Sequence, residues 1–203
     1  MKKILYSALT LILGLVLSSS GCTHDTIDPA LFDEGVTIGG VTWATRNVGE
    51  FGKFAANPED PGMFYQWNRA KAWPATGPFV GWDATNPTGT TWDAANDPCP
   101  SGWHVPTWAQ VESLFAVTKT IGTSGGVDGA YFGTEPNRIF LARTGYVYEA
   151  VLFLETEYGY YFSSTSADEF GAYGFEFNSS VILKGFGYTK AIAQSIRCVK
   201  GAK

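Results

Sequence analysis

The sequence predicts an α+β fold, in which one main helix packs on a mostly antiparallel sheet and long irregular loops complete the domain. Three observations support this prediction. The segment 107–117 combines a helix cap with apolar residues at helical spacing. Segments with the two-residue alternation of strands dominate from residue 138 onward. Residues 49–98 hold six prolines and many Gly, Thr and Asn residues, which favours ordered loop.

The first 21 residues predict an export signal. Two lysines precede an apolar run, 4–17, which is shorter than the roughly 20 residues that a membrane span needs and fits a signal peptide. Small residues at 18–21 lead directly to Cys22, as in a bacterial lipoprotein signal. Acylation of Cys22 would then anchor the protein to a membrane. An ordinary signal peptide with an incidental cysteine is the alternative.

The remaining chain divides into an acidic tether, residues 22–34, and a single domain, residues 35–203, which is long enough for a core of its own. Without the signal, 12 Lys and Arg stand against 19 Asp and Glu, a net charge of −7. This charge argues against a nucleic-acid partner. Bacterial lipoproteins that are retained in the inner membrane carry aspartate directly after the acylated cysteine. Thr23 stands there instead, so the resemblance to a lipoprotein implies the outer membrane or the cell surface.

The first part of the domain predicts little regular structure. In residues 36–48, apolar residues alternate with other residues on both sides of Gly39-Gly40, which indicates a hairpin with a tight turn. Residues 65–73 predict a strand that turns into a short helix. The rest of 49–98 predicts long ordered loop.

The second part of the domain begins with the helix. Thr107 and Gln110 form a capping box, and apolar residues on one face extend the helix to about Val117. Residues 122–133 predict a glycine-rich loop. Strands are then predicted at 139–142, 146–154, 159–164, 173–178, 181–184 and 195–199.

Six short blocks of the domain occur in a recognisable order. They are Val36–Trp43, Tyr65–Trp67, Cys99–Thr107, Thr144–Tyr146, Ser163–Thr165 and Ile196–Lys200. In this order the chain resembles the Fibrobacter succinogenes major paralogous domain family, here on a Bacteroidetes-type lipoprotein. The resemblance implies a C-type lectin-like fold, shared with the formylglycine-generating enzyme group, and it implies no particular activity. Phe162 stands where the family usually has tryptophan, so a role that needs an indole N–H is not carried over.

Cys99 and Cys198 are the two cysteines that remain if Cys22 is acylated. In an exported protein such a pair predicts a disulfide, with a reactive thiol as the alternative. These two cysteines and His104 are too few for a structural zinc site, and we expect neither a metal nor a cofactor. His104 is interpreted as a core residue, with a general base or metal ligand as the alternative. The tripeptide Glu135-Pro136-Asn137 matches the sugar-binding motif of calcium-dependent lectins, but it is interpreted as a turn.

All seven tryptophans lie between Trp43 and Trp108. Among them, Trp73, Trp82 and Trp92 lie in loops rich in Asp and Asn, and they are the candidate ligand-binding residues. Aromatic faces stack on the apolar faces of sugars, while neighbouring polar side chains bind the hydroxyls. The alternative is that these rings fill a small core built from loops.

The sequence therefore predicts a lipid-anchored surface module that binds or adheres to a glycan or a surface protein, without catalysis. No phosphate-binding loop, nucleophile elbow or pair of carboxylates at a known spacing is present, so no catalytic residue is assigned. A structural or accessory subunit of a surface assembly is the second hypothesis. An enzyme on the formylglycine-generating scaffold is the third.

Overall fold

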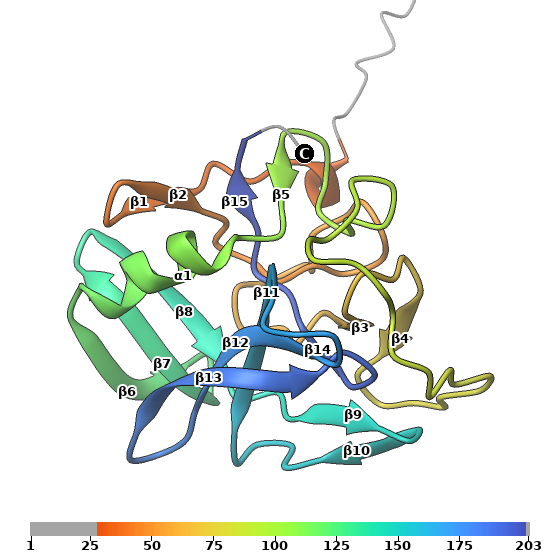
Figure 1. Cartoon of the computed structure of the whole chain (residues 1–203). Helices are drawn as coiled ribbons and strands as arrows, with labels where there is room; N and C mark the ends of the chain where they lie inside the picture. The colour runs from red at the N-terminus through yellow and green to blue at the C-terminus, as the bar shows by residue number, and fades with distance from the viewer. Residues whose placement is uncertain (1–27, 202–203) are drawn as a thin grey trace, which may run out of the picture.

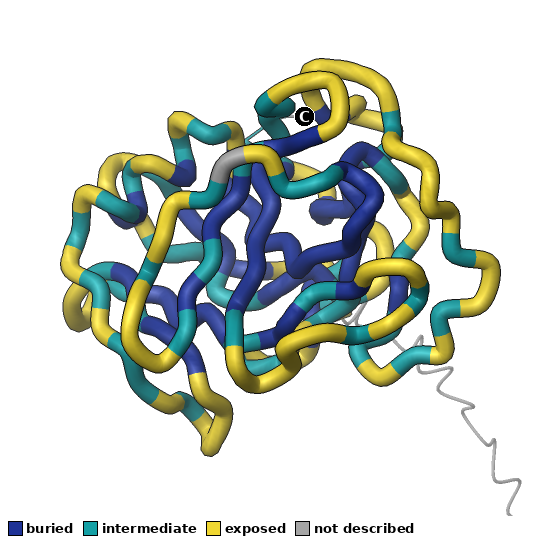
Figure 2. The backbone as a smooth tube through the Cα atoms, turned by 60° about the horizontal axis from the view of Figure 1, so that its bottom comes forward, coloured by how far each residue is buried: buried dark blue, intermediate teal, exposed yellow. Residues whose placement is uncertain are grey.

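The structure, a computed structural model, describes residues 28–201 (Figure 1). The predicted signal peptide and Cys22 lie outside the described residues. Of the described residues, 42% are in strands and 6% in helices, and the strands form three sheets. Figure 2 shows the buried strands at the centre of the molecule, with exposed loops around them. No helix within residues 28–201 is long and apolar enough to cross a membrane.

The first sheet joins the two ends of the domain. Its strand order is β1-β2-β15-β5. The strands are β1 (Val36–Ile38), β2 (Val41–Trp43), β5 (Trp103–His104) and β15 (Val199–Lys200). The predicted hairpin is confirmed, because β1 pairs with β2 around Gly39 and Gly40, which have φ of 58° and 80°. Backbone with positive φ favours glycine at both turn positions.

The second sheet is the largest and has the path β10-β9-β14-β11-β12-β13, with β3 paired to β14 and β4 paired to β3. All its pairs are antiparallel except β11 with β14. The strands are β3 (Met63–Gln66), β4 (Ala72–Pro74), β9 (Tyr146–Tyr148), β10 (Val151–Phe153), β11 (Gly159–Ser166), β12 (Gly171–Phe177), β13 (Ile182–Thr189) and β14 (Ala193–Ser195).

Two predicted segments of this sheet are corrected. The helix expected within 65–73 is absent, because the chain folds back there as the antiparallel pair β3 and β4. The single strand expected at 146–154 is a hairpin, because Glu149 and Ala150 have φ of 48° and 62° and reverse the chain.

The third sheet, β6-β7-β8, replaces the glycine-rich loop that was predicted at 122–133. It consists of β6 (Lys119–Ser124), β7 (Val127–Thr134) and β8 (Asn137–Ala142). Gly125-Gly126 is only the turn between β6 and β7. Gly129 lies within β7, where an added Cβ would meet the Leu141 carbonyl oxygen at 2.2 Å. Glycine is therefore a packing requirement inside this strand, although in the sequence it hides the strand pattern.

The predicted fold class is wrong, since the protein is mostly β and its helix does not form a layer on a sheet. The helix α1 (Trp108–Phe115) has eight residues, about two turns, and adjoins β11 and β12. Its predicted start is confirmed: the Thr107 hydroxyl accepts from the Gln110 backbone N–H, and the Gln110 side chain accepts from the Thr107 N–H. A short 3-10 helix, η1 (Pro29–Leu31), precedes the first strand.

Arg197 links separate parts of the core. Its guanidinium is buried and donates to the Asn47 side-chain oxygen at 2.9 Å and to the carbonyls of Ala44 and Phe140 at 3.1 and 3.0 Å. Burial lowers the pKa of Arg197 to about 10. The group thus remains a cation near neutral pH, and its hydrogen bonds join the segment before β15 to β8 and to the loop after β2.

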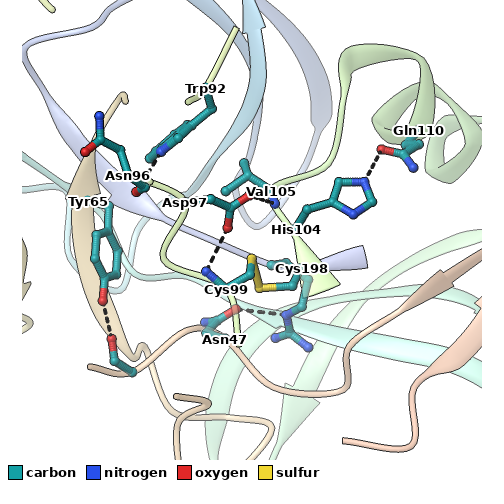
Figure 3. The surroundings of a disulfide bond; sticks show 12 residues. Asn47, Tyr65, Trp92, Asn96, Asp97, Cys99, His104, Val105, Gln110 and Cys198 are labelled. Carbon is teal, nitrogen blue, oxygen red and sulfur yellow. Dashed lines mark hydrogen bonds between the residues drawn. A yellow bond between two sulfur atoms is a disulfide. The ribbon is translucent and has the colours of Figure 1, made fainter. Parts of the chain in front are cut away.

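The predicted disulfide is confirmed. Cys99 and Cys198 are bonded, with their Cα atoms 6.0 Å apart (Figure 3). The segment around Cys99 is also held by Asp97, whose carboxylate accepts hydrogen bonds from the backbone N–H groups of Cys99 and Val105. The bond therefore ties the end of the long loop region to the residue before β15.

Candidate ligand-binding site

Trp73 and Trp82, two of the three predicted ligand-binding residues, pack on each other. Their ring centroids are 5.0 Å apart, and the Lys71 ammonium nitrogen lies 3.9 Å from the centroid of Trp73. Trp73 is 2% exposed, and Trp82 is partly buried. The Trp73 ring belongs to a cluster with Val147 on one face of the second sheet.

Trp92, the third predicted residue, is 8% exposed. Its indole N–H donates to the Asn96 carbonyl at 2.9 Å, and its ring lies 5.9 Å from that of Trp67. Trp73, on β4, and Trp92 therefore serve as core for the loops that follow β4, which was the alternative interpretation. The structure brings none of these rings together as an exposed face.

His104 and Glu135-Pro136-Asn137 also have structural positions. His104 Nε2 lies 3.3 Å from the Gln110 side-chain oxygen, and Figure 3 shows the ring directed toward α1 and away from the disulfide. Glu135 and Pro136 form the turn between β7 and β8, as predicted. Among the described residues, no group of three His, Cys, Asp or Glu side chains is placed to hold a metal ion.

A different aromatic site opens on the second sheet. It is a pocket of about 380 Å³, called the tyrosine pocket below, to which β9, β11, β12, β13 and the segment before β14 contribute. Its lining consists of Tyr146, Tyr148, Tyr160, Glu176, Gly187, Tyr188, Thr189 and Ile192. Four of these eight residues are tyrosines and one is a carboxylate, so the pocket combines apolar ring surface with a few polar atoms, as ligand sites do.

Strand geometry places these side chains on one face. Tyr146 and Tyr148 are two residues apart on β9, so both point to the same side, while Val147 between them packs on the opposite side against Trp73. Tyr160 on β11 is the cross-strand partner of Glu176 on β12, which puts the ring beside the carboxylate.

Tyr188 completes the pocket because glycines leave room for its ring. Gly174 and Gly185 are cross-strand partners on β12 and β13. A Cβ added at Gly185 would lie 2.1 Å from the Tyr188 hydroxyl oxygen, and one added at Gly174 would lie 3.2 Å from the ring. The ring therefore lies over bare backbone, and its hydroxyl donates to Glu176 Oε2 at 2.9 Å.

The planes of the tyrosine rings that line the pocket are steeply inclined to one another. The Tyr146 and Tyr160 centroids are 4.9 Å apart with planes inclined at 73°, and those of Tyr160 and Tyr188 are 5.9 Å apart at 88°. Phe153 stacks on Tyr146 at 5.5 Å, and Tyr158 stacks on Tyr160 at 5.8 Å. These stacking contacts hold the Tyr146 and Tyr160 rings in place before a ligand binds.

The charge in the pocket belongs to Glu176. Burial, followed by the negative charge of Glu176, raises the pKa of Tyr160 and of Tyr188, so both phenols are neutral well above neutral pH. The lining contains no Lys, Arg or His. No ion pair within residues 28–201 involves Glu176.

A second cavity, of about 490 Å³, lies between the loops 86–90 and 166–170. The Lys190 ammonium beside it donates to the carbonyls of Gly89, Asp168 and Glu169 at 3.0, 3.0 and 3.2 Å. One oxygen of the Asp168 carboxylate accepts two backbone N–H groups of its own loop. These charged groups hold the loops together, so the tyrosine pocket is the stronger candidate.

The tyrosine pocket was not predicted, because the tryptophan content of the first half pointed to a different part of the chain. A usable signal was present in the pair Tyr146/Tyr148, which has two-residue spacing inside a predicted strand. Such spacing stands both rings on one face of a sheet.

Comparison of the chain with protein-family models, with curated proteins and with solved structures finds no match. The resemblance to the Fibrobacter succinogenes major paralogous domain family therefore stays a prediction.

Proposed function

We propose that the protein is a lipid-anchored surface module, a member of the family it resembles, that binds carbohydrate in the tyrosine pocket. The observation that carries this proposal is the set of four tyrosine rings around Glu176 and Thr189 in one preformed pocket. Ring faces stack on the C–H faces of sugars, and the carboxylate and hydroxyls bind sugar hydroxyl groups. The pocket volume of about 380 Å³ falls within the usual range of small-molecule sites, about 300–1,000 Å³.

Binding, and not catalysis, is proposed because the pocket holds a single carboxylate. Hydrolysis of a glycosidic bond ordinarily uses two carboxylates that flank the bond. Glu176 is the one acidic residue in the lining, and no histidine accompanies it.

The position of the pocket suits an anchored protein. The η1 helix, at the start of the described chain, lies at the end of the molecule that holds β5 and β15, whereas β9 and β10 lie at the opposite end (Figure 1). An anchor at Cys22 would then leave the pocket on the side that faces away from the membrane. Palmitate labelling that is present in the wild type and lost in Cys22→Ala tests this part of the proposal, and an unlabelled wild type would refute it.

Binding is tested on a panel of polysaccharides with the Cys22→Ser protein, in which acylation is blocked. We expect Tyr148→Ala to reduce affinity about tenfold or more, since it removes one exposed wall. Gly185→Ala should reduce it as well, because the new methyl group displaces the Tyr188 ring.

Matched controls are Tyr131→Ala and Gly122→Ala on the third sheet, where Tyr131 is also partly exposed and Gly122 has ordinary contacts. If the pocket variants and the controls bind equally well, the tyrosine pocket is not the site.

A structural or accessory subunit that recognises protein is the second candidate. It is favoured by the edge strand β10, where Val151, Phe153 and the following Leu154 are 51%, 38% and 37% exposed. Exposed edges of this kind can pair with a strand of another chain. Val151→Lys would weaken such an association, and it would leave polysaccharide binding unchanged.

A further inference from the structure

We infer that the tyrosine pocket selects sugars that carry a free amine, in its ammonium form, over neutral and acidic sugars. This inference rests on the proposed carbohydrate function and specifies the ligand class. It is drawn from the angles between the rings and from the unmatched charge of Glu176.

The ring arrangement suits a compact cation better than a flat sugar alone. A sugar that is bound only by stacking needs one open ring face as a platform. Here Tyr160 meets Tyr146 at 73° and Tyr188 at 88°, so neighbouring rings enclose a corner. An ammonium group in such a corner is attracted by the negative face of a ring, and several rings around one cation are a recurring means of binding ammonium ligands.

The charge of the pocket agrees with this geometry. Glu176 contributes a carboxylate for which the lining supplies no cation. The Tyr188 hydroxyl fixes this carboxylate by donating to Oε2 at 2.9 Å. An ammonium on the ligand would supply the missing countercharge, whereas the carboxylate of an acidic sugar would be repelled.

The phenols complete the selection because they are neutral. Burial and the nearby carboxylate oppose ionisation of Tyr160 and Tyr188. The Tyr188 hydroxyl gives its proton to Glu176, and its oxygen can still accept from a hydroxyl of the same sugar. The pocket thus has one group for the amine and several for the rest of the ring.

The test compares three hexasaccharides with the same β-1,4 linkage, built from glucosamine, N-acetylglucosamine or glucose. Affinities are measured by calorimetry on the Cys22→Ser protein at a mildly acidic pH, at which the amines of the glucosamine hexamer are protonated. We expect the glucosamine hexamer to bind about tenfold or more tightly than either of the others. Added salt should weaken this preference, since part of it is electrostatic.

Glu176→Gln is the decisive variant, because it removes the charge and keeps the shape of the side chain. We expect it to reduce glucosamine-hexamer affinity about tenfold and glucose-hexamer affinity by clearly less, so that the preference for the amine is lost. Glu112→Gln is the matched control: it removes an exposed carboxylate on α1, paired with Lys184, and should change neither affinity.

The two proposals fail in different ways. If the three hexamers bind alike, or if Glu176→Gln weakens all of them equally, the carbohydrate function stands and the selectivity for amines is wrong. If none of the hexamers and no polysaccharide of the panel binds, the carbohydrate function fails, and this inference fails with it.

Discussion

The two halves of the domain use aromatic residues for opposite purposes. In the first half, Trp73 and Trp92 are buried, and they pack against loops that have no strand ladder between residues 75 and 102. In the second half, Tyr146 and Tyr148 stand on strands, and 38% of Tyr148 is exposed. A region without backbone ladders needs large rings for its stability, whereas a sheet that is held by its own hydrogen bonds leaves rings free to face a ligand.

The contrast is sharpest around β9, because the two sets of rings lie on opposite sides of it. Val147 packs with Trp73 on one face, and Tyr146 and Tyr148 line the pocket on the other. The two functions of aromatic residues, stability and recognition, are therefore separable by single substitutions within one sheet.

The largest effect is expected at the disulfide that joins the two halves. The double substitution Cys99→Ala and Cys198→Ala removes a crosslink between residues 99 positions apart. In the chain-entropy model this lowers the free energy of unfolding by about 4–5 kcal/mol. Urea denaturation of the variant and of the wild type measures the difference.

Reduction of the wild type provides the control, since it should lower stability by a similar amount. A thiol assay on the denatured but unreduced protein should detect neither Cys99 nor Cys198. Two free thiols there would show that the halves are not crosslinked.

A smaller loss of stability is expected from Trp73→Ala. The substitution removes a nearly fully buried indole and should cost about 3–5 kcal/mol, because a cavity is left in the cluster with Val147. Affinity of the folded fraction for the glucosamine hexamer should stay within about twofold, because Trp73 faces away from the pocket.

Tyr148→Ala is expected to show the reverse pattern, with stability within about 1 kcal/mol of the wild type and affinity reduced. Thermal unfolding and calorimetry on the same samples give both quantities. Loss of binding in Trp73→Ala at unchanged stability would indicate that the ligand site lies in the tryptophan-rich loops and not in the tyrosine pocket.

The sequence predicted features that depend on local chemistry. The capping box of Thr107 and Gln110 and the Gly39-Gly40 hairpin are specified by a few neighbouring residues, and the Cys99–Cys198 pair follows from the number of cysteines. The predicted fold class gave the helix too large a share of the structure, because a strong cap shows where a helix begins and little about its length.

The remaining features depend on contacts that the sequence order does not show. The third sheet was missed because Gly129 and its neighbouring glycines obscure the alternation of β7, and the need for glycine arises only when β8 lies beside it. The pocket was missed because Tyr160 meets Glu176 through strand pairing, and Tyr188 joins them across a register shift between β12 and β13. Pairing of this kind is non-local, so composition alone pointed to the wrong rings.

The smallest effect is expected in the stability of the protein at alkaline pH, to which Tyr160 and Tyr188 of the tyrosine pocket contribute. The pKa values of Tyr160 and Tyr188 are raised in the folded protein by burial and by Glu176, whereas in the unfolded chain they return to about 10. Near neutral pH both states are protonated, and these phenols add no pH dependence. As the pH rises above about 10, the unfolded chain releases protons that the folded protein retains, so stability falls.

Each phenol contributes at most about 1.4 kcal/mol per pH unit to this fall, and solvent screening at a partly open pocket makes the contribution smaller. Chemical denaturation between about pH 9 and 11 measures it. Glu176→Gln removes one cause of the raised pKa values, so ultraviolet absorbance should detect tyrosinate in the folded variant at lower pH than in the wild type. Glu112→Gln should leave this titration unchanged. An identical titration in Glu176→Gln would mean that the carboxylate does not act on the phenols, and the pocket would then lack the charge on which its preference for amines depends.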